Sequence, residues 1–226
     1  RNLRRCLRGM TPSPTTRLEQ LKEACAATAR RELQWSSIPE HVRPLYTKAV
    51  EKQWASWLDN GAVEFVAPAE AREIERELAE RGDSSRVMDM RYVFTDKNDG
   101  KRTPHNDLPV HASCRIVIPG YSDPDLCSLR RDAPTLSRAG RSLFLLIASA
   151  REHKHWRISS SDIEAAFLKG EKYDRVLYGR PPRRGPPLPG SVPGSLFRIL
   201  KGVFGLNDAP RKWWLRLKQF LLNNGC

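Results

Sequence analysis

The chain has 226 residues, of which 39% are hydrophobic, so it can bury the core of one large domain or two small ones. No run of about 18 apolar residues occurs, so we expect no membrane-spanning helix, and the odd, scattered cysteines argue for a reducing, intracellular setting. The formal net charge of +13 favours a polyanionic partner such as nucleic acid, because lysine and arginine release counterions when they neutralise phosphates.

The spacing of apolar residues predicts a mixed succession of helices and strands. Helices are indicated where apolar residues recur every three or four positions, and strands where they alternate or form short runs. In chain order we expect a basic arm and a helix within 1–35, a helix over 39–58, a strand over 62–66, a charged helix over 68–82, strands over 87–94 and 115–118, a helix over 136–150, strands over 156–158, 176–178 and 196–200, and a helix over 209–222. This order lacks the strict alternation of a doubly wound sheet, so the expected class is mixed α and β.

A proline-rich stretch interrupts the second half of the chain. Six prolines lie between Gly179 and Gly194, which predicts an extended surface loop, because proline cannot donate to a helix or a sheet. The PxxP spacing in this stretch leaves open a further interpretation, a ligand for a proline-binding domain.

The most informative stretch for chemistry is residues 161–170, which read SDIEAAFLKG. A strand is expected to end at Asp162, and a short turn then leads to Phe167. Phosphoryl transfer needs divalent ions held by carboxylates, and an aspartate at a strand end is held rigidly enough to bind Mg²⁺. For this stretch alone, an ordinary turn aspartate remains the simpler interpretation.

Residues 161–170 resemble motif A of copia-type reverse transcriptases, the polymerases of one class of LTR retrotransposon, which reads roughly Asp-Val-x-x-Ala-Phe-Leu-x-Gly. By this resemblance, Asp162 is the catalytic aspartate that binds the metal, and the backbone carbonyl of Ile163 also faces the metal. Phe167 falls on the family's steric gate, an aromatic ring that accepts deoxynucleotides and refuses ribonucleotides.

A second match covers residues 200–213, LKGVFGLNDAPRKW, which resemble the family's motif B, Leu-Tyr-Gly-Leu-Lys-Gln-Ala-Pro-Arg-x-Trp. The resemblance implies that Phe204 and Gly205 line the dNTP site and that Pro210 and Arg211 contact template and primer. A glycine lets the backbone approach a ligand closely, and proline suits the first turn of a helix.

Motif B departs from the family at Asn207-Asp208, where Lys-Gln is usual. The departure removes a positive charge and adds a negative one, which we expect to lie near the nucleotide and to lower the efficiency of the enzyme. A looser match lies upstream, where residues 91–100, RYVFTDKNDG, and 114–117, CRIV, are similar to the family's fingers hairpin. It implies that Lys97 and Arg115 bind the triphosphate, although cations on a solvated hairpin are the simpler alternative.

The resemblance implies an α+β fold, with right-hand polymerase fingers and a partial palm whose antiparallel sheet is backed by helices, truncated before the family's Tyr-x-Asp-Asp hairpin. No Asp-Asp pair occurs in the sequence, so the catalytic site is expected to be incomplete and the chain inactive alone. The expected segments are an N-terminal arm and helices over 1–61, a first fingers segment over 62–132, the first part of the palm with motif A over 133–170, a second fingers segment with the proline-rich loop over 171–200, and motif B with its helix over 201–226.

The implied function is that of an RNA-directed DNA polymerase within a Pol polyprotein, which transfers a nucleotide from a dNTP to a primer 3′-OH by a two-metal mechanism. The implied cofactor is Mg²⁺, with Mn²⁺ as an alternative, and the implied partners are an RNA template, a DNA primer and a dNTP, with no membrane. A cytoplasmic particle and the nucleus both remain open as locations, as does the oligomeric state. The alternative function is that of a non-catalytic, nucleic-acid-binding remnant of a decayed element.

Overall fold

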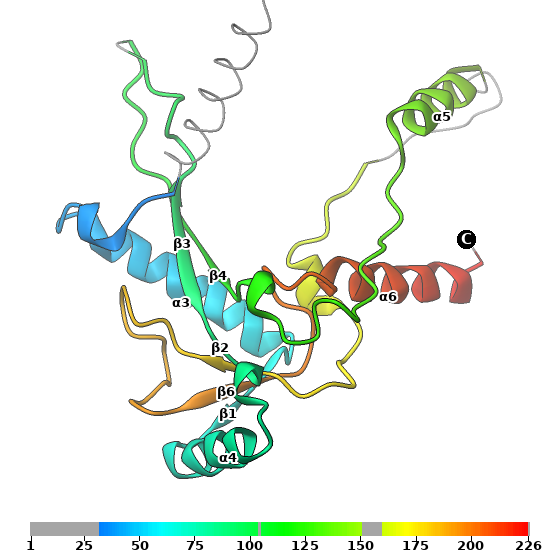
Figure 1. The fold of residues 1–226 in the computed structure, drawn as a ribbon. Coiled ribbons are helices and arrows are strands. Elements are labelled where there is room, and N and C mark those ends of the chain that lie inside the picture. The colour runs from blue at the N-terminus through cyan, green and yellow to red at the C-terminus, as the bar shows by residue number, and fades with distance from the viewer. Residues whose placement is uncertain (1–31, 104, 151–159, 226) are drawn as a thin grey trace, which may run out of the picture. The chain divides into compact units, whose positions relative to one another are not determined.

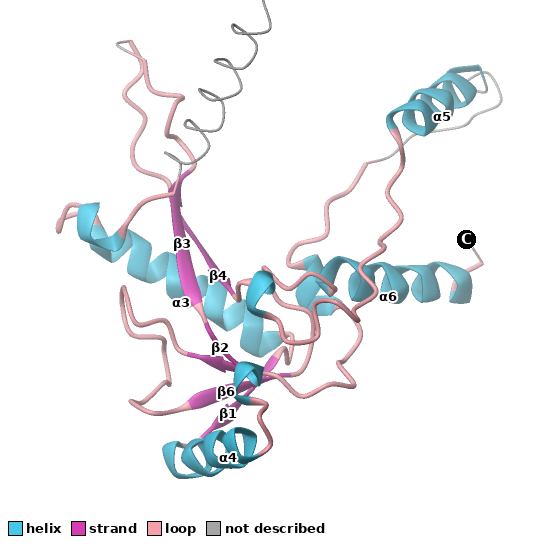
Figure 2. Cartoon of the chain, viewed as in Figure 1, coloured by secondary structure: helices cyan, strands magenta, loops and turns pink. Residues whose placement is uncertain are grey.

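The computed structural model describes residues 32–103, 105–150 and 160–225 (Figure 1). Helices and strands alternate with long loops (Figure 2), and their mixture confirms the predicted α+β class. The elements are η2 (Trp35–Ser37), α3 (Arg43–Asp59), β1 (Val63–Val66), α4 (Pro68–Glu80), η3 (Ser84–Arg86), β2 (Val87–Asp89), β3 (Arg91–Asp96), β4 (Ala112–Val117), η4 (Gly120–Ser122), α5 (Arg138–Ala150), η6 (Ala166–Lys169), β5 (Tyr178–Arg180), β6 (Leu196–Ile199) and α6 (Ala209–Asn223).

The predicted elements that fall within the described residues are found in the predicted order, with several differences in their bounds. Strand β4 begins at Ala112 instead of residue 115, and β5 covers Tyr178–Arg180 instead of 176–178. The helix expected from residue 39 begins at Arg43, because Pro39 starts a turn in which its carbonyl accepts hydrogen bonds from the amides of Val42 and Arg43. The strand expected over 87–94 is broken at Met90, whose amide donates to the carbonyl of Arg180. Strands β2 and β3, on either side of this residue, belong to different sheets. Most of the helix expected within 1–35 and the whole strand over 156–158 lie outside the described residues.

Within the described residues the chain forms two compact units, one from residues 32–49 and 93–114 and one from residues 50–92 and 115–225. The second unit contains a four-stranded sheet in the order β1-β6-β5-β2. Strands β1, β6 and β5 pair antiparallel, whereas β2 pairs parallel with β5. The sheet is therefore mixed, and all four of its strands lie in the segments expected to form the fingers.

Two helices of this unit cover opposite faces of the sheet. Phe197 of β6 packs edge-to-face on Trp54 of α3, with ring centroids 4.7 Å apart. The next residue along the strand, Leu196, is buried with Val66 and with Leu78 of α4. Because neighbouring residues of a strand point to opposite faces, α3 and α4 must lie on the two sides of β6.

Within the first unit, the end of the β3–β4 hairpin is held by Asp96. Its carboxylate accepts hydrogen bonds from the amides of Asn98 and His111, each at 2.9 Å, and from Arg102 at 2.5 Å. Burial of Asp96 opposes its ionisation, but these hydrogen bonds outweigh burial and the pKa of the carboxyl lies below its ordinary value. The predicted turn at Asp99-Gly100 is present, and Gly100 supplies a positive φ of 72°.

Helix α5 carries the apolar face that its sequence predicts, but that face is solvent-exposed. Leu143, Leu146 and Ile147 are exposed by 58%, 67% and 45%, so little of this surface is covered by the rest of the described chain. In the part of the chain that the structure describes, no helix is both long and apolar enough to cross a membrane.

Candidate nucleotide and nucleic-acid site

The segment that resembles motif A is an irregular turn, not the end of a described strand. Residues 160–163 have no regular structure, and the 3-10 helix η6 follows them. Ala165 precedes η6 with a φ of 54°, a left-handed conformation that a side chain with a Cβ adopts at a cost of about 1–2 kcal/mol. This backbone turns the chain sharply between Asp162 and Phe167.

Asp162 and Ile163 are exposed at the surface of this turn. Within the described ranges, the Asp162 carboxylate has no hydrogen bond or ion pair, so its oxygens are free to bind a cation. No group of three or more histidine, cysteine, aspartate or glutamate side chains suited to a metal occurs among the same residues. Asp162 therefore fits the role of one Mg²⁺ ligand, and the described chain supplies no complete ligand set around it.

The two stretches that resemble polymerase motifs meet in space. The rings of Phe167 and Phe204 lie edge-to-face with their centroids 5.7 Å apart, a favoured geometry for an aromatic pair. Behind them the backbone is closely packed. A Cβ on Gly202 would lie 3.3 Å from the carbonyl oxygen of Phe167, and a Cβ on Gly170 would lie 3.1 Å from the amide nitrogen of Trp213. Two residues predicted to face the nucleotide are thus neighbours.

Gly205 is required by the packing of motif B against the chain that follows β4. Its φ is +97°, and a Cβ there would lie 2.2 Å from the carbonyl oxygen of Ile118, far inside any normal contact. The amide of Ile118 in turn donates to the Phe204 carbonyl at 2.9 Å. The glycine was predicted to allow close approach of a ligand, and the close approach found here is to the protein's own backbone.

The two predicted triphosphate ligands are exposed on different parts of the hairpin. Arg115 lies on β4 of the second unit, between the buried side chains of Cys114 and Ile116. Lys97 lies at the turn in the first unit. Both cations are therefore accessible to an anionic ligand.

The expectation that Asp208 places a negative charge near the nucleotide is wrong. Asp208 is only 3% exposed, and its carboxylate accepts hydrogen bonds from the hydroxyl of Tyr173 at 2.8 Å and from Arg175 at 3.0 Å. Its charge is offset by the guanidinium inside the protein. The neighbouring Asn207 donates to the Gly120 carbonyl at 2.8 Å, so both unusual residues bind the protein itself.

Arg175 is the centre of a larger buried network. It binds both oxygens of Asp123, at 2.7 and 2.9 Å, and reaches Asp125 at 3.1 Å, while Arg86 also binds Asp125. Burial alone would lower the pKa of Arg175, but hydrogen bonds and charges from Asp123 and Asp208 raise it above its ordinary value. Sequence reasoning missed this network, because nothing in the sequence pairs Arg175 with aspartates so far away along the chain.

Arg211, predicted to contact template and primer, already has a partner in the chain. Its guanidinium binds the carboxylate of Asp132 at 2.5 Å and the backbone carbonyl of the same residue at 3.0 Å. The side chain of Asp132 is 62% exposed and that of Arg211 is 15% exposed, so only the carboxylate side of this ion pair is open to solvent. Pro210 occupies the first turn of α6, as predicted.

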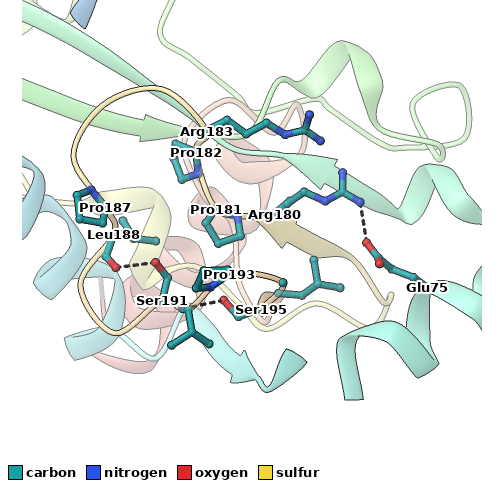
Figure 3. A pocket seen from close by; sticks show the side chains of 13 residues that line it. Glu75, Arg180, Pro181, Pro182, Arg183, Pro187, Leu188, Ser191, Pro193 and Ser195 are labelled. Carbon is teal, nitrogen blue, oxygen red and sulfur yellow. Dashed lines mark hydrogen bonds and ion pairs between the residues drawn. The ribbon is translucent and has the colours of Figure 1, made fainter. Parts of the chain in front are cut away.

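The proline-rich loop is held against the core and is not a free peptide. The carbonyls of Pro186 and Pro189 accept hydrogen bonds from Tyr92 at 3.0 Å and Trp54 at 2.9 Å, and Leu188 is buried. The loop lines an open pocket of about 400 Å³, shown in Figure 3, whose lining includes an ion pair between Arg180 and Glu75. None of the predicted site residues lines this pocket. These contacts favour a structural role over a proline-motif ligand.

Comparison with known proteins gives two relatives. The Retrovirus-related Pol polyprotein from transposon RE2 of Arabidopsis thaliana is 29% identical over 146 residues, which cover 62% of this chain and 9% of the polyprotein. The predicted resemblance to the Pol polyproteins of copia-type retrotransposons is confirmed. The corresponding polyprotein from transposon RE1 is 28% identical over 142 residues, again 62% of this chain and 9% of the relative. This Pol-like chain thus spans about a tenth of the length of the relatives it matches. No family model and no solved structure matches it.

Proposed function

We propose that this chain is the fingers and the first part of the palm of a copia-type reverse transcriptase, an RNA-directed DNA polymerase. The observation that carries the proposal is the contact between Phe167 and Phe204. Two stretches that resemble motifs A and B independently in sequence pack on each other, as residues of one nucleotide site must. The similarity to two retrotransposon Pol polyproteins supports the same family.

In this function, Asp162 and the carbonyl of Ile163 hold Mg²⁺, or Mn²⁺ in its place. The bound ions would stabilise the attacking and leaving oxygens of nucleotidyl transfer. The half-buried ring of Phe167, fixed against Phe204, fills the space of a ribose 2′-hydroxyl and so selects a dNTP. Its orientation is constrained by packing, which is the property a steric gate needs.

The cations of the site hold the remaining substrates. Lys97 and Arg115 bind the triphosphate, the first as a point charge and the second as a bidentate donor. Pro210 and Arg211 contact the RNA template and DNA primer at the start of α6. For Arg211, a backbone phosphate replaces the carboxylate of Asp132, which is 62% exposed and can turn to water when it is displaced.

The test is primer extension on an RNA template. The protein assayed is the chain together with any flanking polypeptide that its gene encodes. Replacing Asp162 with asparagine should abolish extension, because a neutral amide binds Mg²⁺ far more weakly than a carboxylate does. The variant should fold normally, since Asp162 is exposed. The matched control is Asp59→Asn, another exposed aspartate, which should extend like the wild type.

A second variant tests the steric gate. Phe167→Val should admit ribonucleotides while retaining incorporation of deoxynucleotides. Full extension by Asp162→Asn, or unchanged sugar selectivity in Phe167→Val, would contradict the proposal. If the wild type binds nucleic acid but never extends a primer, the chain is the non-catalytic remnant instead.

A further inference from the structure

Three segments of the second unit meet beside the start of α6. The strand-like residue Lys172 forms an antiparallel bridge with Lys201. Two hydrogen bonds flank this bridge. The amide of Tyr173 donates to the carbonyl of Leu200 at 2.8 Å, and the amide of Glu171 donates to the carbonyl of Lys212 in α6 at 3.4 Å. The chain after motif A therefore lies between the strand that leads into motif B and the helix that follows it.

This arrangement gathers three positive charges. Residues paired across an antiparallel bridge place their side chains on the same side, where like charges are destabilising. Arg216 lies four residues after Lys212, one helical turn along the same face of α6. Burial lowers the pKa of Lys201, and the charges of Lys172 and Arg216 lower it further, as expected for an ammonium with two cations near it.

Within the described part of the chain, these positive charges are not offset by ion pairs. Among the residues that the structure describes, no acidic side chain forms an ion pair with Lys172, Lys201 or Arg216. The nearby Asp174 binds Lys212 instead, at 3.7 Å. Lys201 is also held in place, because its ammonium donates to the Asn60 carbonyl at 2.5 Å. A fixed lysine flanked by two exposed, unpaired cations is a destabilising arrangement unless an anion binds to it.

We infer that Lys172, Lys201 and Arg216 bind the phosphodiester backbone of a nucleic acid. Lys172 and Arg216 are exposed, so the site is open along the surface and suits an extended polyanion better than an enclosed small ligand. The inference goes beyond the proposed polymerase function, because phosphate binding at this cluster requires neither the metal nor Asp162. Bound phosphates would offset the mutual repulsion of Lys172, Lys201 and Arg216, which otherwise destabilises the folded chain.

The test is the affinity of the full chain for a labelled single-stranded RNA, measured by fluorescence anisotropy over a series of salt concentrations without nucleotide or divalent ions. The variant carries Lys172→Gln, Lys201→Gln and Arg216→Gln. Each lost phosphate contact should lower the salt slope by about 0.7, so the slope should fall by about 2 and the affinity in ~0.1 M salt by about a hundredfold. An unchanged affinity and slope would overturn the inference.

A matched control separates this site from net charge. Arg72→Gln, Arg76→Gln and Arg81→Gln together remove the same charge from α4 and its end, where Arg76 and Arg81 pair with glutamates. This variant should bind within about threefold of the wild type, because two of its three arginines are already paired with glutamates and release few counterions. An equal loss of affinity in both triple variants would mean that net charge alone drives binding and would refute a localised site.

Two further measurements decide the remaining alternatives. A variant that keeps the charges, Lys172→Arg, Lys201→Arg and Arg216→Lys, should bind RNA like the wild type even if the glutamine variant unfolds. Loss of binding in this variant would count against a charge-based site.

Inorganic tripolyphosphate should displace the RNA only at concentrations far above those of a competing unlabelled RNA. Displacement at equal phosphate concentration would identify a free-anion site instead. Since the assay contains no dNTP, an absence of polymerase activity would leave its outcome unaffected.

Discussion

Replacing Arg175 with methionine should destabilise the second unit severely, because it leaves two carboxylates buried without their cation. The side chain of Asp123 is 0% exposed and that of Asp208 is 5% exposed, so neither can recover its interaction by turning to water. Breaking a buried ion pair from one side typically costs about 3–5 kcal/mol. That is a large part of the roughly 5–15 kcal/mol by which a protein of this kind is stable.

The free energy of unfolding can be measured by urea titration, followed by the fluorescence of the buried Trp54 and Trp57. Methionine is chosen because it fills most of the volume of the arginine stem, so the loss reports charge and hydrogen bonding instead of a cavity. Arg138→Met serves as the control, since Arg138 is exposed on α5 and should change stability by less than about 0.5 kcal/mol.

The reasoning also predicts a rescue. Adding Asp123→Asn to the Arg175→Met variant removes one of the two stranded charges and should recover part of the lost stability. An effect of Arg175→Met below about 1 kcal/mol, or no recovery in the double variant, would refute the view that this network stabilises the second unit.

Gly205→Ala should destabilise the chain by about 2 kcal/mol or more, because its Cβ would overlap the Ile118 carbonyl at a φ of +97°. Thermal melting tests this against Gly190→Ala, where φ is +77° but no atom lies within 4 Å, and equal losses in the two variants would contradict the packing argument. The chain should also lose stability in acid, since the pKa values of Asp96 and Asp125 are lowered. Their contributions are present above the unfolded pKa of about 3.9 and are lost as the pH falls through the folded values, so urea midpoints compared at about pH 7 and 3 should differ less in Asp125→Asn than in the wild type.

The elements that sequence predicted well are those whose signals are local. Apolar spacing gave the order of helices and strands, and the turn at Asp99-Gly100 follows from two adjacent residues. The break at Met90 could not be predicted, because it arises when β2 pairs with β5, which lies far along the chain. The bounds of an element thus depend on partners that periodicity does not reveal.

The candidate site divides in the same way. Motif resemblance assigns both Phe167 and Phe204 to the nucleotide site, and the structure shows that their rings are in contact. It misplaced Asp208, since the sign of a charge was visible in the sequence but its burial beside Arg175 was not. Local sequence identifies which chemistry is present, and only the fold decides whether that chemistry faces a ligand or the protein itself.

The alternation of Leu196 and Phe197 on β6 has a consequence for how this chain can vary. One residue completes the layer under α4 and the next completes the layer under α3, so a shift of β6 by a single position would empty both layers at once. An inserted or deleted residue in the proline-rich loop therefore cannot be absorbed by sliding the strand. Any change in loop length must therefore be accommodated between Pro181 and Ser195. Related sequences can differ in length there while the residues of β6 keep their positions under α3 and α4.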